Sequence, residues 1–179
     1  MADSPSLFAP LATLTVVWSA AWADFRTFKI PNVLSVSGAV LGLLVHAWDS
    51  GFAGLWLGLV GLGLGMGLLL PGYVVQSTGA GDVKLMGAVG ALLGPRQLLW
   101  AFLFAVLTAG VMSVLHGLVA WRTRGATGPI GRYAGMIRCL WVTGRLSYVR
   151  PRPGEFMAEP IPLAVAIAIG STIAILRPL

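Results

Sequence analysis

Long apolar stretches, separated by short segments of charged and turn-forming residues, run along most of the chain. A helix needs about 20 mostly apolar residues to cross the hydrocarbon core of a bilayer. The spacing of charges, glycines and prolines between these stretches predicts six helices, at about 7–23, 32–48, 52–72, 83–95, 97–121 and 160–176. The fourth stretch is short, so we expect this helix to tilt, to begin a turn earlier within 79–82, or to cross only part of the bilayer.

Composition strengthens the prediction of an all-α integral membrane protein. Hydrophobic residues make up 57% of the 179 positions and charged residues only 10%, whereas about a quarter of the residues of a soluble domain are charged. This excludes an ordinary soluble globule, and we expect a single transmembrane domain over 1–179. The net charge of +6 does not indicate a nucleic-acid partner, because the basic residues do not alternate with aromatic residues on a soluble face.

The basic residues predict the orientation in the membrane, because lysine and arginine near helix ends prefer the cytoplasm. With about six crossings and both termini outside, ten of the twelve basic residues lie inside: Arg26, Lys29, Lys84, Arg122, Arg124, Arg132, Arg138, Arg145, Arg150 and Arg152. Only Arg96 and Arg177 then lie outside. Seven of the arginines fall in one predicted cytoplasmic loop, at about 122–158.

Two further patterns predict how helices lie against their surroundings. The third predicted helix carries six glycines, including three Gly-x-x-x-Gly spacings that favour close packing of helix backbones: Gly54, Gly58, Gly61, Gly63, Gly65 and Gly67. In the basic loop, a helix over 131–147 would place five apolar or aromatic residues on one face, opposite Arg138 and Arg145: Tyr133, Met136, Ile137, Leu140 and Trp141. Such a helix is expected at the membrane interface against anionic headgroups; an anchor for topology or a substrate contact is the alternative.

Candidate chemistry lies where two helices meet the cytoplasmic interface. Asp24 ends the first predicted helix and Asp82 opens the fourth, 58 positions later. Packing the two helices side by side would set these carboxyls face to face, and ionisable groups at membrane depth are functional candidates. A close carboxyl pair shares a proton, so one member can deprotonate a water that attacks a peptide carbonyl while the other protonates the oxygen.

Simpler explanations of the two aspartates stay open at this point. Asp82 is equally well suited to cap a helix N-terminus, and Asp24 can pair with Arg26 or Lys84. A transporter or scaffold could also use the pair to bind protons or cations. No metal site or cofactor is expected, since the chain has one cysteine, Cys139, and its two histidines lie in apolar surroundings.

Neighbouring residues fit a substrate site. Gly79 and Gly81 allow backbone conformations and close approaches that other residues do not, so a substrate strand could lie against the loop that carries Asp82. Pro31 loses no hydrogen bond at the start of the second helix, and its fixed φ sets a sharp re-entry after Asp24.

The motifs around both aspartates resemble a known family. Gly79-Ala80-Gly81-Asp82-Val83-Lys84 is similar to the Gly-x-Gly-Asp-x-Lys signature of the type IV prepilin peptidases. The segment from Asp24 to Ile30-Pro31-Asn32 resembles the first-aspartate motif of that family, and 161–170 resembles its final helix. Presenilin relatives share Gly-x-Gly-Asp, but their first aspartate usually follows a tyrosine, whereas Asp24 follows an alanine.

The resemblance implies a function and a set of residues. It implies an aspartic endopeptidase of the bacterial inner membrane that removes the short basic leader of a prepilin at the cytoplasmic face, with Asp24 and Asp82 as the catalytic pair. Gly79, Gly81, Lys84, Pro31 and Asn32 are the supporting motif residues. The size of the chain resembles the minimal peptidases of tight-adherence (Flp) pili.

Two expectations concern activity beyond the catalytic pair. Larger relatives carry a cytoplasmic segment with paired cysteines and also methylate the pilin, so with one cysteine and an early first helix we expect no methyltransferase activity. Glu155 and Glu159 precede the last helix and are candidates for attracting the basic leader. Reversing both charges should then weaken the processing of a basic leader more than that of a neutralised one.

Overall fold

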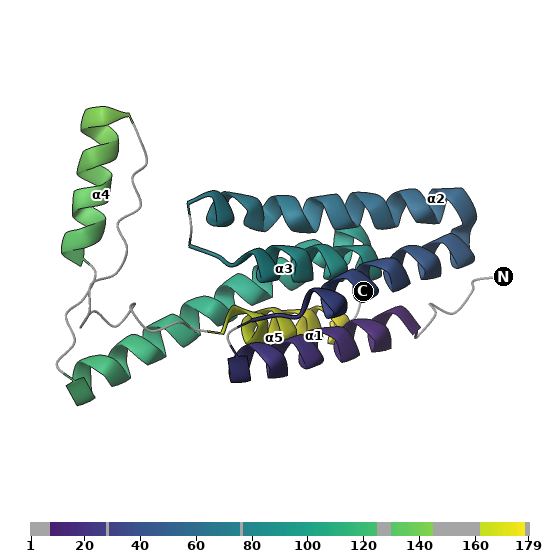
Figure 1. Ribbon diagram of the computed structural model, residues 1–179, viewed down its shortest axis with the longest axis horizontal. Coiled ribbons are helices and arrows are strands. Elements are labelled where there is room, and N and C mark those ends of the chain that lie inside the picture. Colours follow the sequence, from purple (N-terminus) through teal and green to yellow (C-terminus); the bar gives the residue numbers. More distant parts are fainter. Residues whose placement is uncertain (1–7, 28, 76, 125–129, 145–161, 178–179) are drawn as a thin grey trace.

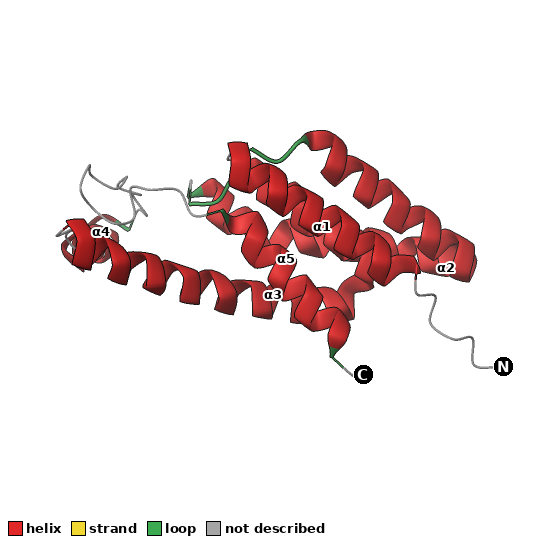
Figure 2. Cartoon of the chain, turned by 90° about the horizontal axis from the view of Figure 1, so that it is seen from below, coloured by secondary structure: helices red, strands yellow, loops and turns green. Residues whose placement is uncertain are grey.

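Every regular element in the described part of the chain is a helix. The computed structural model describes residues 8–27, 29–75, 77–124, 130–144 and 162–177 (Figures 1 and 2). Its helices are α1 (Phe8–Thr27), α2 (Asn32–Val74), α3 (Ala80–Arg124), α4 (Ile130–Thr143) and α5 (Leu163–Leu176). The prediction of an all-α protein is thereby confirmed for these ranges.

The two longest helices bend where the sequence predicts breaks. α2 leaves helical geometry at Ser50 and at Gly51, which has a φ of 58°. α3 does so at Gly94, which has a φ of 74° and is followed by Pro95. Glycine adopts positive φ at little cost and proline cannot extend a helix toward its N-terminus, so these residues divide α2 and α3 into two limbs each. The predicted fourth helix is the first limb of α3 and begins at Ala80, a turn earlier than 83.

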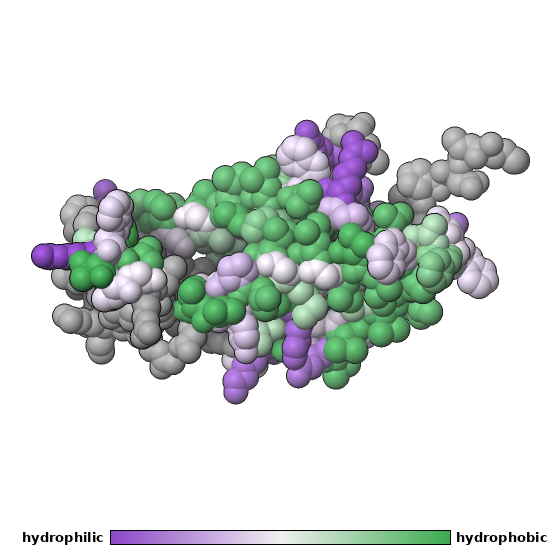
Figure 3. All heavy atoms as spheres, turned by 90° about the horizontal axis from the view of Figure 1, so that it is seen from above, coloured by the Kyte–Doolittle hydropathy of each residue, from purple (hydrophilic) through white to green (hydrophobic). Residues whose placement is uncertain are grey.

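The surface of the long helices is apolar. Asn32–Val74 and Ala80–Val119 are long and apolar enough to cross a membrane, yet only 22% and 17% of their most apolar windows are buried. A soluble protein would turn such helices toward its core. Large side chains face outward instead, including Trp48 at 91% and Phe52 at 83% exposed, and apolar residues cover most of the described surface in Figure 3. This surface is typical of a membrane protein.

α5 lies between α1 and α3 and fills the core with them (Figures 1 and 2). Val17 of α1, Leu85 and Leu98 of α3 and Ile167 of α5 are all almost fully buried. A side chain added at Gly170 would meet the backbone of α3 at Ala101 and Ala105, so the two helices touch through their main chains. α5 therefore packs against both helices that carry the aspartates.

A row of glycines brings α2 against α3. The second limb of α2 runs along the first limb of α3 (Figure 1), and four of its glycines are buried: Gly54, Gly58, Gly61 and Gly65. A Cβ at Gly61 would collide with the carbonyl of Gly90, and one at Gly65 with that of Met86. Gly63 and Gly67 face open space, so close packing explains only part of the glycine-rich pattern.

α4 stands apart from the other helices. Among the described residues it packs against no other helix, and its axis crosses the direction of the others (Figure 1). It ends at Thr143, before the predicted 147, because Gly144 takes a φ of 65°. Ile137 and Trp141 are 58% and 85% exposed. Arg145, expected on the opposite face, lies outside the described residues.

Candidate active site

The two aspartates line one cavity. Asp24 lies in the last turn of α1 and Asp82 in the first turn of α3, and these helix ends meet the start of α5 at one end of the bundle (Figure 1). The cavity has a volume of about 320 Å³ and is lined by Asp24, Lys29, Ile30, Asn32, Gly79, Ala80, Gly81, Asp82 and Lys84. The fold thus brings together the two motifs that are 58 positions apart in the sequence.

Asp24 is held by the start of α5. Its side chain is only 8% exposed, and its Oδ2 accepts a hydrogen bond of 3.2 Å from the backbone N–H of Ala164. Ala164 is the second residue of α5, where backbone N–H groups have no partner within the helix. The carboxylate supplies that partner, and the positive end of the helix dipole favours its negative charge.

The two cations proposed as partners of Asp24 make other contacts. The guanidinium of Arg26 lies over the ring of Trp22, 4.6 Å from its centroid. Lys84 Nζ donates a hydrogen bond of 2.9 Å to Oδ1 of Asn32. The structure therefore does not support the alternative in which Asp24 serves to neutralise Arg26 or Lys84.

Asp82 caps its own helix. Its Oδ2 accepts a 3.2 Å hydrogen bond from the N–H of Gly79, the residue before α3, as the third residue of a capping box does. The helix-cap interpretation is thus correct for one oxygen of this carboxylate. Asp82 lines the same cavity as Asp24, and two carboxylates that repel each other in a partly buried site favour a state that shares one proton.

The motif glycines leave room for neighbouring groups. A Cβ at Gly79 would lie 3.1 Å from Oδ2 of Asp82, and one at Gly81 would lie 3.1 Å from Cβ of Ile30. Neither has the positive φ that Gly51, Gly94 and Gly144 show among the described residues. Close approach, not an unusual backbone conformation, is therefore the reason for glycine here. Gly81 also lines the cavity, and the expected substrate strand beside this loop stays a prediction.

Pro31 and Asn32 set the start of α2 beside the cavity. Pro31 is the N-cap, with φ −61° and ψ 128°, and α2 begins at Asn32. The N–H of Leu34 donates to the carbonyl of Pro31 at 3.1 Å. Through the bond between Asn32 and Lys84, this turn is tied to the helix that carries Asp82.

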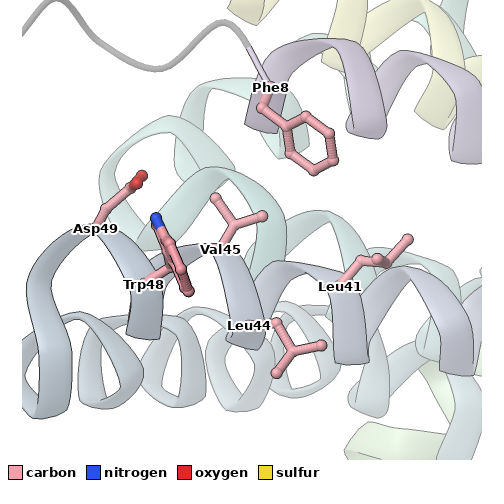
Figure 4. Close-up of a pocket in the computed structure, with 6 residues that line it drawn as sticks. All are labelled: Phe8, Leu41, Leu44, Val45, Trp48 and Asp49. Atoms are coloured by element: carbon pink, nitrogen blue, oxygen red, sulfur yellow. The ribbon is translucent and has the colours of Figure 1, made fainter.

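The remaining candidates for the site are two glutamates. Glu155 and Glu159 lie outside the described residues. No three His, Cys, Asp or Glu side chains in the described ranges are grouped so as to hold a metal ion. Another cavity, about 340 Å³, is an apolar groove between the start of α1 and the end of the first limb of α2, with Asp49 at its edge (Figure 4).

One part of the site has no counterpart among the sequence predictions. The N–H of Ala164 belongs to the backbone, so the identity of the residue does not indicate that it donates a hydrogen bond to Asp24. The available signal was the resemblance of 161–170 to a final family helix, which marks the element but not its contact with Asp24.

Comparison with known proteins decides the family. The model of the type IV leader peptidase family matches residues 11–114, more than half of the chain. The chain belongs to this family. Both aspartates lie within the residues that match the type IV leader peptidases, whereas α5 lies beyond them.

A curated relative extends the similarity over nearly the whole chain. It is the prepilin leader peptidase/N-methyltransferase of Bacillus subtilis (strain 168), with 28% identity over 180 residues. The alignment covers 97% of this chain and 57% of the relative, so the chain spans little more than half of the relative's length. No solved structure matches the chain.

Proposed function

We propose that this protein is a prepilin leader peptidase. It removes the short basic leader from a type IV or Flp-type prepilin at the cytoplasmic face of the bacterial inner membrane, as an aspartic endopeptidase without a cofactor. The observation that carries the proposal is the cavity shared by Asp24 and Asp82 in a chain of the type IV leader peptidase family.

The geometry suits the hydrolysis of a peptide bond by two carboxyls. Each aspartate has Oδ2 bound to a backbone N–H, which leaves Oδ1 for a water and the substrate. One carboxylate takes a proton from the water while the hydroxide attacks the carbonyl carbon, and the other carboxyl protonates the carbonyl oxygen. When the C–N bond breaks, the proton held by the first aspartate passes to the amine, and a hydroxyl of the gem-diol intermediate returns its proton to the second aspartate as the carbonyl re-forms.

The proposed membrane arrangement is a single domain over 1–179 with about six crossings and both termini outside. Support comes from the helix limbs that coincide with the expected spans and from the outward-facing apolar side chains. The ten-to-two distribution of basic residues supports an active site at the cytoplasmic side.

We also propose that α4 lies on anionic headgroups at that side. Its exposed apolar residues, Ile137, Leu140 and Trp141, need a partner, and no acidic residue occurs between Asp82 and Glu155. A basic leader would be repelled by this loop, whereas an anionic lipid surface attracts it. Glu155 and Glu159 remain the proposed contacts of the leader.

Substituting the two aspartates tests the function. Asp24→Asn and Asp82→Asn should each lower cleavage of a co-expressed pilin precursor by about 10²–10⁴-fold, because each removes a general acid or base. Mass spectrometry of the pilin reports the cleavage site and any N-methylation, which we do not expect. Asp49→Asn is the matched control, since Asp49 borders the groove at the opposite end of the bundle (Figure 4).

Normal cleavage by either aspartate variant, inserted at the wild-type level, would refute the assignment. A transporter or scaffold that uses the pair to bind protons or cations is not favoured by membership in a peptidase family. If the protein were such a transporter or scaffold, the pilin precursor would stay uncleaved even when the wild-type protein is present.

A further inference from the structure

We propose that the first turn of α5 is a third component of the active site and that Ala164 is a positioning residue for Asp24. This proposal rests on the function proposed above. It starts from the hydrogen bond of 3.2 Å between the N–H of Ala164 and Oδ2 of Asp24, which joins residues 140 positions apart.

The bond lies in a closed environment. Ala164 is fully buried and Asp24 is 8% exposed, so water competes little for either group. A buried carboxylate without a hydrogen-bond donor is costly, and the amide of Ala164 meets this need. Two residues earlier, Pro162 at the N-cap offers no N–H of its own. The Ala164 N–H therefore both stabilises the carboxylate and fixes its rotation.

α5 is well placed to act as a rigid support. One turn before its end, Thr172 Oγ1 accepts a 3.3 Å hydrogen bond from Trp18 Nε1 of α1. Midway along α5, Gly170 touches the backbone of Ala105 in α3. α5 is thus fixed against α1 and α3, between which it lies (Figure 2). Its first turn is part of the same continuous helix and is therefore held in place as well.

Fixing the carboxylate matters because the proposed reaction needs two carboxyls on opposite sides of one water. A displacement of about 1 Å in a catalytic group can cost roughly 10²-fold in rate. Without the Ala164 N–H, the Asp24 side chain is free to rotate away from Asp82. The residues that match the family model end at 114, so the proposal makes activity depend on a turn outside the matched region.

Hydrogen–deuterium exchange on the full-length protein in nanodiscs tests the contact without any measurement of activity. In Asp24→Ala, the amides of 163–166 should exchange about tenfold faster or more, because the first turn loses a charged hydrogen-bond acceptor. Asp24→Asn keeps an acceptor, so exchange there should stay near wild type although cleavage is lost. Asp82→Ala is the matched control and should leave α5 protected. Equal exchange in Asp24→Ala and Asp82→Ala would overturn the proposal.

Cleavage kinetics test the consequence. Ala164→Pro removes the N–H in the first helical turn, where proline is tolerated, and should lower kcat roughly 10²-fold with KM little changed. Ala164→Gly keeps the N–H and should retain most of kcat. If Ala164→Pro inserts and cleaves like Ala164→Gly, the positioning role is refuted. If wild-type protein does not cleave any pilin precursor, the proposed function fails, while the exchange experiment still decides whether α5 holds Asp24.

Discussion

Both aspartates combine a structural hydrogen bond with a position at the same cavity. Asp82 accepts the N–H of Gly79 at the start of its own helix, and Asp24 accepts that of Ala164 at the start of another. Capping and catalysis are compatible, because a carboxylate has two oxygens and each cap uses one. The two residues also differ: Asp82 is fixed by its own local sequence, whereas Asp24 depends on the tertiary packing of α5.

The hydrogen bond between Lys84 and Asn32 is expected to hold the two halves of the site together. Lys84→Met and Asn32→Ala should each lower cleavage by about 2–10-fold, the value of one hydrogen bond. The double variant should be little worse than either single one, because both remove the same bond. A double-mutant cycle on kcat/KM measures this.

Lys29→Met provides the matched control for that cycle, since Lys29 also lines the cavity. Its effect should add to that of Asn32→Ala. Fully additive losses from Lys84→Met and Asn32→Ala would contradict the proposed link.

The sequence predicted some residues of the site but not all of their contacts. Asp24 and Asp82 were identifiable because both occur at the end of an apolar stretch and because their flanking motifs are specific. The reason for Gly81 was not identifiable, since it depends on where Ile30 packs. The contact between Ala164 and Asp24 could not be predicted, because every residue except proline has a backbone N–H and the two residues are 140 positions apart.

At the level of elements, local turn chemistry made the helix breaks predictable. The bends at Ser50–Gly51 and Gly94–Pro95 fall at the expected boundaries, because glycine and proline impose their geometry irrespective of tertiary context. Which glycines face a neighbouring helix was not predictable from spacing alone. Gly61 and Gly63 belong to the same pattern, yet only Gly61 meets the backbone of α3.

This difference provides a matched pair of variants. Gly61→Ala should lower the free energy of unfolding by about 1–3 kcal/mol, because the added methyl group collides with the carbonyl of Gly90 and α2 must move. Gly63→Ala faces open space and should leave stability unchanged or raise it by up to about 1 kcal/mol through helix propensity. Thermal unfolding in detergent measures both, and equal shifts in Tm would show that the α2–α3 contact is not as tight as described.

For the whole molecule, the aspartate cavity and the apolar groove lie at different ends of the bundle. The aspartate cavity lies where α1 ends and α3 and α5 begin, and the apolar groove of Figure 4 lies where α1 begins. Exposed apolar side chains occupy the length between them. The proposed orientation assigns the aspartate end and α4 to the cytoplasm, and this assignment is open to direct test.

The lone cysteine, Cys139, lies on α4 and serves as a native probe. A membrane-impermeant maleimide should label it in inverted inner-membrane vesicles and not in intact spheroplasts. Ile137→Cys in a Cys139→Ser background moves the thiol about 200° around the helix axis from position 139, onto the apolar face. This thiol should react with the maleimide more slowly than Cys139, because lipid shields it. Labelling of Cys139 in spheroplasts would reverse the orientation, and equal rates at the two positions would argue against lipid contact by α4.

The bond between Asp24 and Ala164 also bears on the order in which the protein is made. A ribosome adds Asp24 to the chain 140 residues before Ala164, a delay on the order of ten seconds at about 5–20 residues per second. During this interval α1 and the first limb of α3 can already lie in the membrane, with both carboxyls present but Asp24 lacking its partner. Under the proposed role of α5, competence comes with the insertion of this helix, so a growing chain that lacks α5 does not yet carry the complete proposed site.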